Sequence, residues 1–150
     1  MQPKLRVLAV LLFLTFTAGA AMAATDDACS LVTQAQVSSA VGTSVSAGEY
    51  VTPTFKKTCT WHAKGIIVTL NLQDASAFDK GKQMAAYGAK MTEFGGLGDG
   101  AYYMTMGPQQ VALMVKKGNT AFKVAVYSKL PIEKLEAMEK TVAQQVVGKL

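Results

Sequence analysis

The chain is organised around Lys57-Thr58-Cys59-Thr60-Trp61-His62-Ala63-Lys64-Gly65-Ile66-Ile67-Val68-Thr69-Leu70-Asn71-Leu72, which holds the only Trp, the only His and one of the two Cys. Two runs rich in β-forming residues flank Lys64-Gly65, and this pattern predicts a β-hairpin. Because side chains alternate along a strand, Cys59 and Trp61 should lie on one face and His62 on the other. The second arm should point inward with its alternating apolar residues Ile66, Val68, Leu70 and Leu72.

The first residues have the features of a secretory signal peptide. Lys4 and Arg6 give a positively charged start, residues 7–18 are apolar, and Ala21-Met22-Ala23 is a small-residue cleavage site. We therefore expect residues 1–23 to be removed, which leaves residues 24–150 as one domain in the periplasm or outside the cell. No later run is apolar enough to span a bilayer.

A lipid anchor on Cys29 is the alternative to simple cleavage. The bacterial attachment pattern needs an apolar residue three positions before the cysteine, where this chain has Asp26. We therefore expect no lipid anchor.

The mature chain is basic through lysine alone. Without Lys4 and Arg6 the formal net charge falls from +5 to +3, and no Arg is left. Recognition of phosphate or guanine relies heavily on the guanidinium fork, and the lysines are scattered along the chain. We therefore expect no nucleic-acid partner.

Cys29 and Cys59 are the only cysteines. Two cysteines in an exported chain most often form a disulfide. Such a bridge would close a loop of about 30 residues and stabilise the fold by about 3 to 4 kcal/mol. The alternative is a reactive or metal-binding thiol pair, but the chain lacks the Cys-x-x-Cys spacing that favours one.

The first half should contain two helices with strands between them. Thr33 and Gln36 form a capping box that predicts a helix ending near Gly42, after a loose tail over residues 24–28. Residues 43–56, which include a proline, predict an edge strand or irregular ribbon before the hairpin. A second helix is expected from about residue 76 to about Lys90, with small residues on its apolar face.

The second half predicts a strand over residues 101–106 and a hairpin of residues 111–116 and 121–127. A final helix begins near Pro131, and its apolar residues recur at three- and four-residue steps. The expected fold is an α+β two-layer sandwich, an antiparallel sheet of about five to six strands with helices on one face. The expected order is α-β-β-β-α-β-β-β-α, and the core-facing residues of the hairpin are Val111, Leu113, Val115, Phe122, Val124 and Val126.

Aromatic side chains are the first candidate binding residues. Tyr and Trp offer apolar area together with a polar group, which suits a ligand cleft between the sheet and the helices. The candidates are Trp61, Tyr87, Tyr102, Tyr103 and Tyr127. Alternatively, these residues only fill the core or cover the sheet surface.

Methionines suggest a second kind of site. Met104 and Met106 share one strand face, and with Met91, Met114 and His62 they could bind a soft metal. Thioether ligands suit Cu(I), which an exported protein would meet. The alternative is that the methionines fill irregular gaps under a helix.

His62 also raises the possibility of a small hydrolase. Neither a nucleophile nor an orienting carboxylate can be named for it, and a histidine on the outer sheet face is the simpler interpretation. The glycine-rich run at residues 95–100 follows an expected helix, and no Lys-Ser/Thr comes after it. It is therefore not a nucleotide-binding loop, and we expect no cofactor.

A family pattern is carried by Cys29-Ser30-Leu31-Val32-Thr33, Cys59-Thr60-Trp61 and Gly96-Leu97-Gly98-Asp99-Gly100-Ala101-Tyr102, followed by a Lys-Gly hairpin and a C-terminal helix. This pattern resembles a broad group of small exported bacterial proteins of unknown function, many of them actinobacterial lipoproteins. The resemblance implies a disulfide between Cys29 and Cys59 and a sheet-plus-helix domain, with no catalytic residue. The extracellular sensor domains of some bacterial kinases are similar in layout, which implies ligand binding by analogy alone.

Together these features predict an exported, non-enzymatic binding module. Its partner would be an apolar or amphipathic ligand, or another protein. Copper handling through Met104, Met106 and His62 is one alternative, and a small hydrolase is another.

Overall fold

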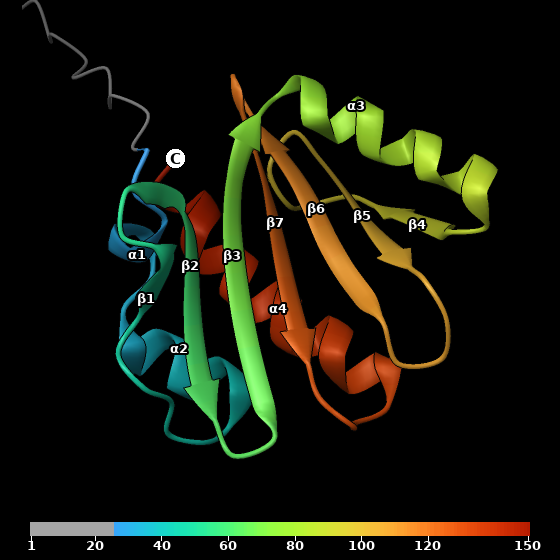
Figure 1. Cartoon of the computed structure of the whole chain (residues 1–150). Helices are drawn as coiled ribbons and strands as arrows, with labels where there is room; N and C mark the ends of the chain where they lie inside the picture. The colour runs from blue at the N-terminus through green and yellow to red at the C-terminus, as the bar shows by residue number, and fades with distance from the viewer. Residues whose placement is uncertain (1–25) are drawn as a thin grey trace, which may run out of the picture.

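The computed structural model describes residues 26–150, so the expected signal peptide at residues 1–23 lies outside the described part of the chain. Within it, seven strands form one antiparallel sheet in the order β1-β2-β3-β7-β6-β5-β4 (Figure 1). The strands are β1 (Glu49–Thr52), β2 (Phe55–Ala63), β3 (Ile66–Asp74), β4 (Lys90–Phe94), β5 (Gly100–Thr105), β6 (Val111–Lys117) and β7 (Thr120–Tyr127). The helices are α1 (Ala28–Leu31), α2 (Gln34–Val41), α3 (Ser76–Lys82) with the 3₁₀ helix η1 (Gln83–Tyr87), and α4 (Ile132–Val147).

The central segment forms the predicted hairpin of β2 and β3. It turns at Gly65, whose φ of 74° is a left-handed conformation that favours glycine. Trp61 lies opposite Val68 and Cys59 lies opposite Leu70. All four are buried, as is Leu72, so the predicted inward row is confirmed from Val68 to Leu72. Ile66, next to the turn, is half-buried and packs against the edge of the core.

The helix-covered face of the sheet holds the main core. Helices α1, α2 and α4 pack on this face, with α4 lying across β6 and β7. Leu135 and Val142 of α4 are fully buried there, and the predicted inward rows of the second hairpin are buried in the same core. The predicted capping box of α2 is also present, since Thr33 and Gln36 exchange hydrogen bonds before the helix ends at Gly42.

Cys29 and Cys59 form the predicted disulfide, which joins α1 to β2. The helix α1 itself was not predicted, because four residues are too few for a helical period to be read. Asp27 caps it by accepting a hydrogen bond from the Ser30 N–H.

The sheet has seven strands, so the expectation of five to six was wrong. The second helix was expected to reach about Lys90, but α3 ends at Lys82 and η1 at Tyr87. The residues after it form β4, an edge strand that pairs with β5. The glycine-rich run therefore follows a strand and not a helix, and it connects two antiparallel neighbours. The sequence KMTEF shows no clear apolar alternation, because an edge strand buries few side chains.

The expectation that all helices lie on one face was also wrong. Helix α3 packs on the outer face, where Phe78 contacts a small cluster with Tyr102, Met114 and Ala121. The close approach needs Gly81, because a Cβ there would clash with the Tyr102 hydroxyl. Where β5, β6 and β7 lie under α3, their apolar side chains point to both faces of the sheet. Helices therefore have to shield both faces from water there. The fold is thus a sheet–helix sandwich with a partial third layer.

Strands β6 and β7 separate at one end. They pair from Lys117↔Thr120 as far as Leu113↔Val124, where the pairing stops. Beyond that point β6 remains paired with β5, as far as the pair Thr105↔Val111. Strand β7 remains paired with β3, as far as the pair Ile67↔Tyr127. We call the opening between residues 111–112 and residues 125–126 the fork; Figure 1 shows the two strands diverging there with α4 behind them. None of the helices in residues 26–150 is both long and apolar enough to cross a membrane.

Candidate ligand-binding face

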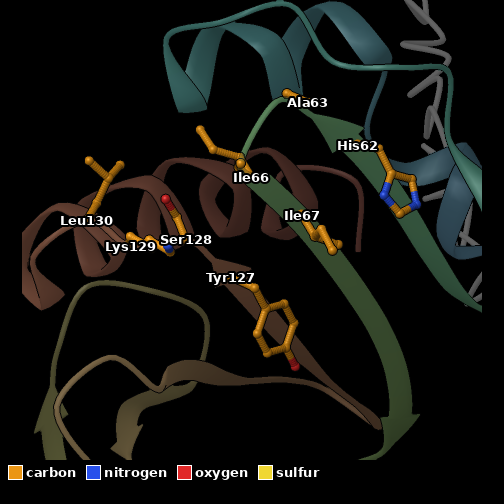
Figure 2. A pocket seen from close by; sticks show the side chains of 9 residues that line it. His62, Ala63, Ile66, Ile67, Tyr127, Ser128, Lys129 and Leu130 are labelled. Carbon is orange, nitrogen blue, oxygen red and sulfur yellow. The ribbon is translucent and has the colours of Figure 1, made fainter.

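Helix α3 covers only part of the outer sheet face, and three side chains form a row across the uncovered part. The register places His62 opposite Ile67, and Ile67 opposite Tyr127. Figure 2 shows these side chains in succession on β2, β3 and β7. Ile67 is 40% exposed and Tyr127 is 49% exposed. Large apolar groups are thus presented to solvent side by side.

A groove of about 620 Å³ lies along this row at the ends of the strands. The residues that leave β7 complete it, and its other lining residues are Ala63, Gly65, Ile66, Ser128, Lys129 and Leu130 (Figure 2). Its lining is mainly apolar, and its polar groups are the hydroxyls of Tyr127 and Ser128, the imidazole of His62 and the ammonium group of Lys129.

A second, smaller pocket of about 190 Å³ lies at the fork, and we call it the fork pocket. Tyr127 lines both pockets, so the two adjoin. The fork pocket has apolar walls and three side chains that can donate hydrogen bonds. It is lined by Met104, Met106, Gln110, Val111, Ala112, Lys123 and Tyr127.

The charge of the two pockets has one sign. Among the described residues, no Asp or Glu lines either of them. Lys123 and Lys129 also have no ion pair there, whereas Lys82 is 2.6 Å from a carboxylate oxygen of Glu93. Two ammonium groups beside apolar surface, with no counter-ion in the described part of the chain, favour a ligand with a negative group.

Glu139 is a buried acid that the sequence analysis did not identify. It lies on the sheet side of α4 with no exposed surface, and its Oε1 accepts a hydrogen bond of 2.9 Å from the Val126 N–H. Its Oε2 has no partner among the described residues. Burial raises the pKa of Glu139 to about 9; the Val126 hydrogen bond lowers this pKa and the charge of Glu136 raises it further. The carboxyl is therefore protonated at neutral pH.

A signal for Glu139 was present in the sequence. The apolar row of the last helix contains Leu135 and Val142, and position 139 lies between them at helical spacing. An acid at a position where the periodicity requires an apolar residue indicates a special role.

The five predicted aromatic residues do not line a common cleft. Trp61 and Tyr103 are buried on the helix-covered face, and Tyr102 is buried on the other face under α3. Tyr87 is 81% exposed on η1, and only Tyr127 reaches the groove. Tyr102 and Tyr103 are separated because consecutive residues of a strand point to opposite faces.

Both buried tyrosines use their hydroxyls to hold a helix. Tyr102 donates to the Phe78 carbonyl oxygen at 2.9 Å, and Tyr103 donates to the Glu136 carbonyl oxygen at 2.8 Å. Burial raises the pKa of each tyrosine to about 12, so both remain donors at neutral pH. Their role here is structural.

The proposed metal ligands are only partly brought together. His62 on β2 and Met104 on β5 are four strand steps apart, or about 19 Å at the usual strand spacing. The methionines, by contrast, are neighbours: Met91 lies opposite Met104, which lines the fork pocket with Met106. The described residues contain no group of three His, Cys, Asp or Glu that could hold a metal ion. Because both cysteines are in the disulfide, the thiol-pair alternative was wrong.

His62 has no catalytic partner within residues 26–150. Its imidazole makes no hydrogen bond or ion pair there, and the groove that it shares with Ser128 contains no carboxylate. The orienting carboxylate of a catalytic triad is therefore not found beside His62 among the residues that line this groove in the described part of the chain.

Comparison of the chain with protein-family models, curated proteins and solved structures found no match. The resemblance to small exported bacterial proteins therefore stays a prediction.

Proposed function

We propose that the protein is a non-enzymatic binding module that holds an anionic amphipathic molecule on the open face of its sheet. The supporting observation is that a mainly apolar groove and the fork pocket adjoin at Tyr127, beside two lysines that have no counter-ion within residues 26–150. The groove volume of about 620 Å³ lies within the usual range for small-molecule sites, about 300–1,000 Å³. Export of the module remains part of the proposal, and the disulfide is compatible with it.

Binding is driven by apolar burial and directed by charge. The apolar part of the ligand covers Ile67 and Tyr127, which solvent reaches in the free protein. Its acidic group lies near Lys123, and none of the described residues that line this pocket carries a carboxylate that would repel it. A neutral molecule of the same shape lacks the attraction to the lysine ammonium groups, and a cationic molecule is repelled by them.

Isothermal titration with decanoate tests the proposal, with decyltrimethylammonium as the probe of opposite charge. Decanoate is expected to bind and to shift the amide resonances of Ile67 and Tyr127, and the cationic probe is expected to bind at least about tenfold more weakly. Ile67→Glu should weaken decanoate binding by about tenfold or more, because burying an Ile contributes about 1.5–3 kcal/mol. Val51→Glu is the matched control, since Val51 is 64% exposed on the edge strand β1. Equal affinities for the two probes, or equal losses in the two variants, would contradict the proposal.

A second candidate function is Cu(I) binding. The observation that favours it is the placement of Met91 directly opposite Met104, with Met106 two residues further along the chain on the same side. Three thioethers form a soft ligand set that suits Cu(I). Competition for Cu(I) against a chromogenic chelator tests this: Met104→Leu should abolish competition while His62→Ala leaves it intact. An unchanged Met104→Leu protein would eliminate this function.

A further inference from the structure

The fork brings together an interrupted sheet, a buried acid and a pocket. Two possible pairs of the β6–β7 ladder, residues 111–112 with residues 126–125, are not formed. Val126 donates its N–H to Glu139 on the helix-covered side. Val111 and Tyr127 line the fork pocket on the open side.

The acid at position 139 is costly to the fold. A buried carboxyl with one unpartnered oxygen loses hydration that it regains only in part through the Val126 hydrogen bond. An apolar residue would complete the buried row of Leu135 and Val142, and Val126 could then take an acceptor on β6. A residue that lowers the stability of the fold, such as a buried acid, is expected mainly where it contributes to a functional site.

We propose that Glu139 is a positioning residue that holds the fork open, so that the fork pocket admits the acidic group of the amphiphile beside Lys123. Glu139 Oε1 satisfies the Val126 N–H without β6, and the two strands stay apart. Lys123, Gln110 and the Tyr127 hydroxyl supply donors to the acidic group, and the methionines contact its first methylenes. The ligand in this inference rests on the proposed function, whereas the state of the fork does not.

The protonated carboxyl of Glu139 does not oppose an anion in the neighbouring pocket. Because it is neutral at pH 7, the charge nearest to the ligand is the Lys123 ammonium, which has no ion pair among the described residues. An ionised acid at the same place would repel the ligand instead. Burial of Glu139 thus keeps the two strands apart and also keeps a negative charge away from the acidic group of the ligand.

Nuclear magnetic resonance of the ligand-free protein tests the fork itself. Glu139→Gln keeps an acceptor for Val126, and Glu139→Leu removes it. The parent and Glu139→Gln should show no backbone contact between Val111 and Val126, and their Val126 amide should exchange slowly. Glu139→Leu should show either a new Val111–Val126 contact or Val126 exchange faster by about tenfold or more. A Glu139→Leu protein with the parent's spectrum at the fork would overturn the inference.

Titration with decanoate then tests the consequence for binding. Glu139→Gln should bind within about twofold of the parent, whereas Glu139→Leu should bind at least about tenfold more weakly where the new contact closes the pocket. Decanoate binding that survives Glu139→Gln but not Glu139→Leu shows that the acceptor for Val126 positions the fork. A general structural effect of losing the acid would weaken binding in both variants. If the parent binds no decanoate, the proposed function fails while the resonance experiment still decides the state of the fork.

A third variant keeps the inference testable if Glu139→Leu does not fold. Lys123→Met removes the ammonium group from the half-buried edge of the fork pocket. It should weaken decanoate by about tenfold and leave 1-decanol unchanged, because only the carboxylate uses the charge. Equal effects on the two probes would place the acidic group elsewhere and overturn the inference.

Discussion

Replacement of Glu139 by Gln should stabilise the protein at neutral pH. The carboxyl is completely buried, and its pKa rises from the ordinary value of 4.5 to about 9 on folding. At pH 7 the unfolded chain therefore releases a proton that the folded protein keeps. Ionisation of the carboxyl in the unfolded chain favours unfolding at pH 7. Gln offers Val126 the same kind of acceptor but cannot ionise, so it removes this contribution to unfolding.

The size and the sign of the effect follow from linkage. A group whose folded pKa is raised contributes its full stability below the unfolded pKa of 4.5, and this is lost as pH rises towards the folded pKa of about 9. Between these two pKa values the free energy of unfolding falls by about 1.4 kcal/mol for each pH unit. At pH 7 the protein has therefore lost on the order of 3 kcal/mol of stability relative to pH 4.5. Glu139→Gln should recover that amount at pH 7 and almost none at pH 4. The corresponding rise in melting temperature at pH 7 is roughly 10 °C.

Urea denaturation followed by fluorescence measures this difference, because the only tryptophan, Trp61, is 1% exposed. Parent and variant are compared at pH 4, 5.5 and 7. Glu49→Gln is the matched control, since Glu49 is exposed on β1 and should give no pH-dependent gain. A Glu139→Gln gain that is the same at pH 4 and pH 7, or a loss at pH 7, would refute the reasoning.

Three further changes in stability are expected. Cys59→Ser should lower the free energy of unfolding by about 3 to 4 kcal/mol, because it opens a loop with a sequence separation of 30 residues; melting curves equal to the parent's would speak against the bridge, and Met104→Leu should change the curve little. Gly81→Ala should cost about 1–3 kcal/mol in urea denaturation through its clash with the Tyr102 hydroxyl, whereas Gly95→Ala meets no atom within 4 Å and should cost far less. Thr33→Ala should cost about 1 kcal/mol, measured in the same way, by removing the cap of α2, and no change would contradict the role of that cap.

The elements with a strong local period were predictable. The hairpin around Gly65, the capping box at Thr33 and the helix after Pro131 each follow from residues close together in the chain. The strand β4 was not predictable in this way, because it is an edge strand held by pairing with β5 and buries few side chains.

The candidate site was much less predictable than the fold. Tyr127 was proposed as a binding residue and does line the groove, but the other aromatic candidates are dispersed by the alternation of strands and by the position of α3. His62 and Met104 were grouped by chemistry, and the strand order separates them. Neither strand order nor the face that a helix covers is encoded in a local period.

The amino-acid sequence by itself determined the periodic elements, their inward faces and the pairing of its two cysteines, because these depend on neighbours in the chain and on residue counts. Only the tertiary structure showed that β6 and β7 part at Leu113↔Val124 and that Glu139 meets Val126 at the opening. The physical reason is that a hydrogen bond between α4 and β7, and the separation of two strands, arise from the packing of the whole sheet against its helices. Such contacts leave no repeating pattern, only a single acid in an otherwise apolar row.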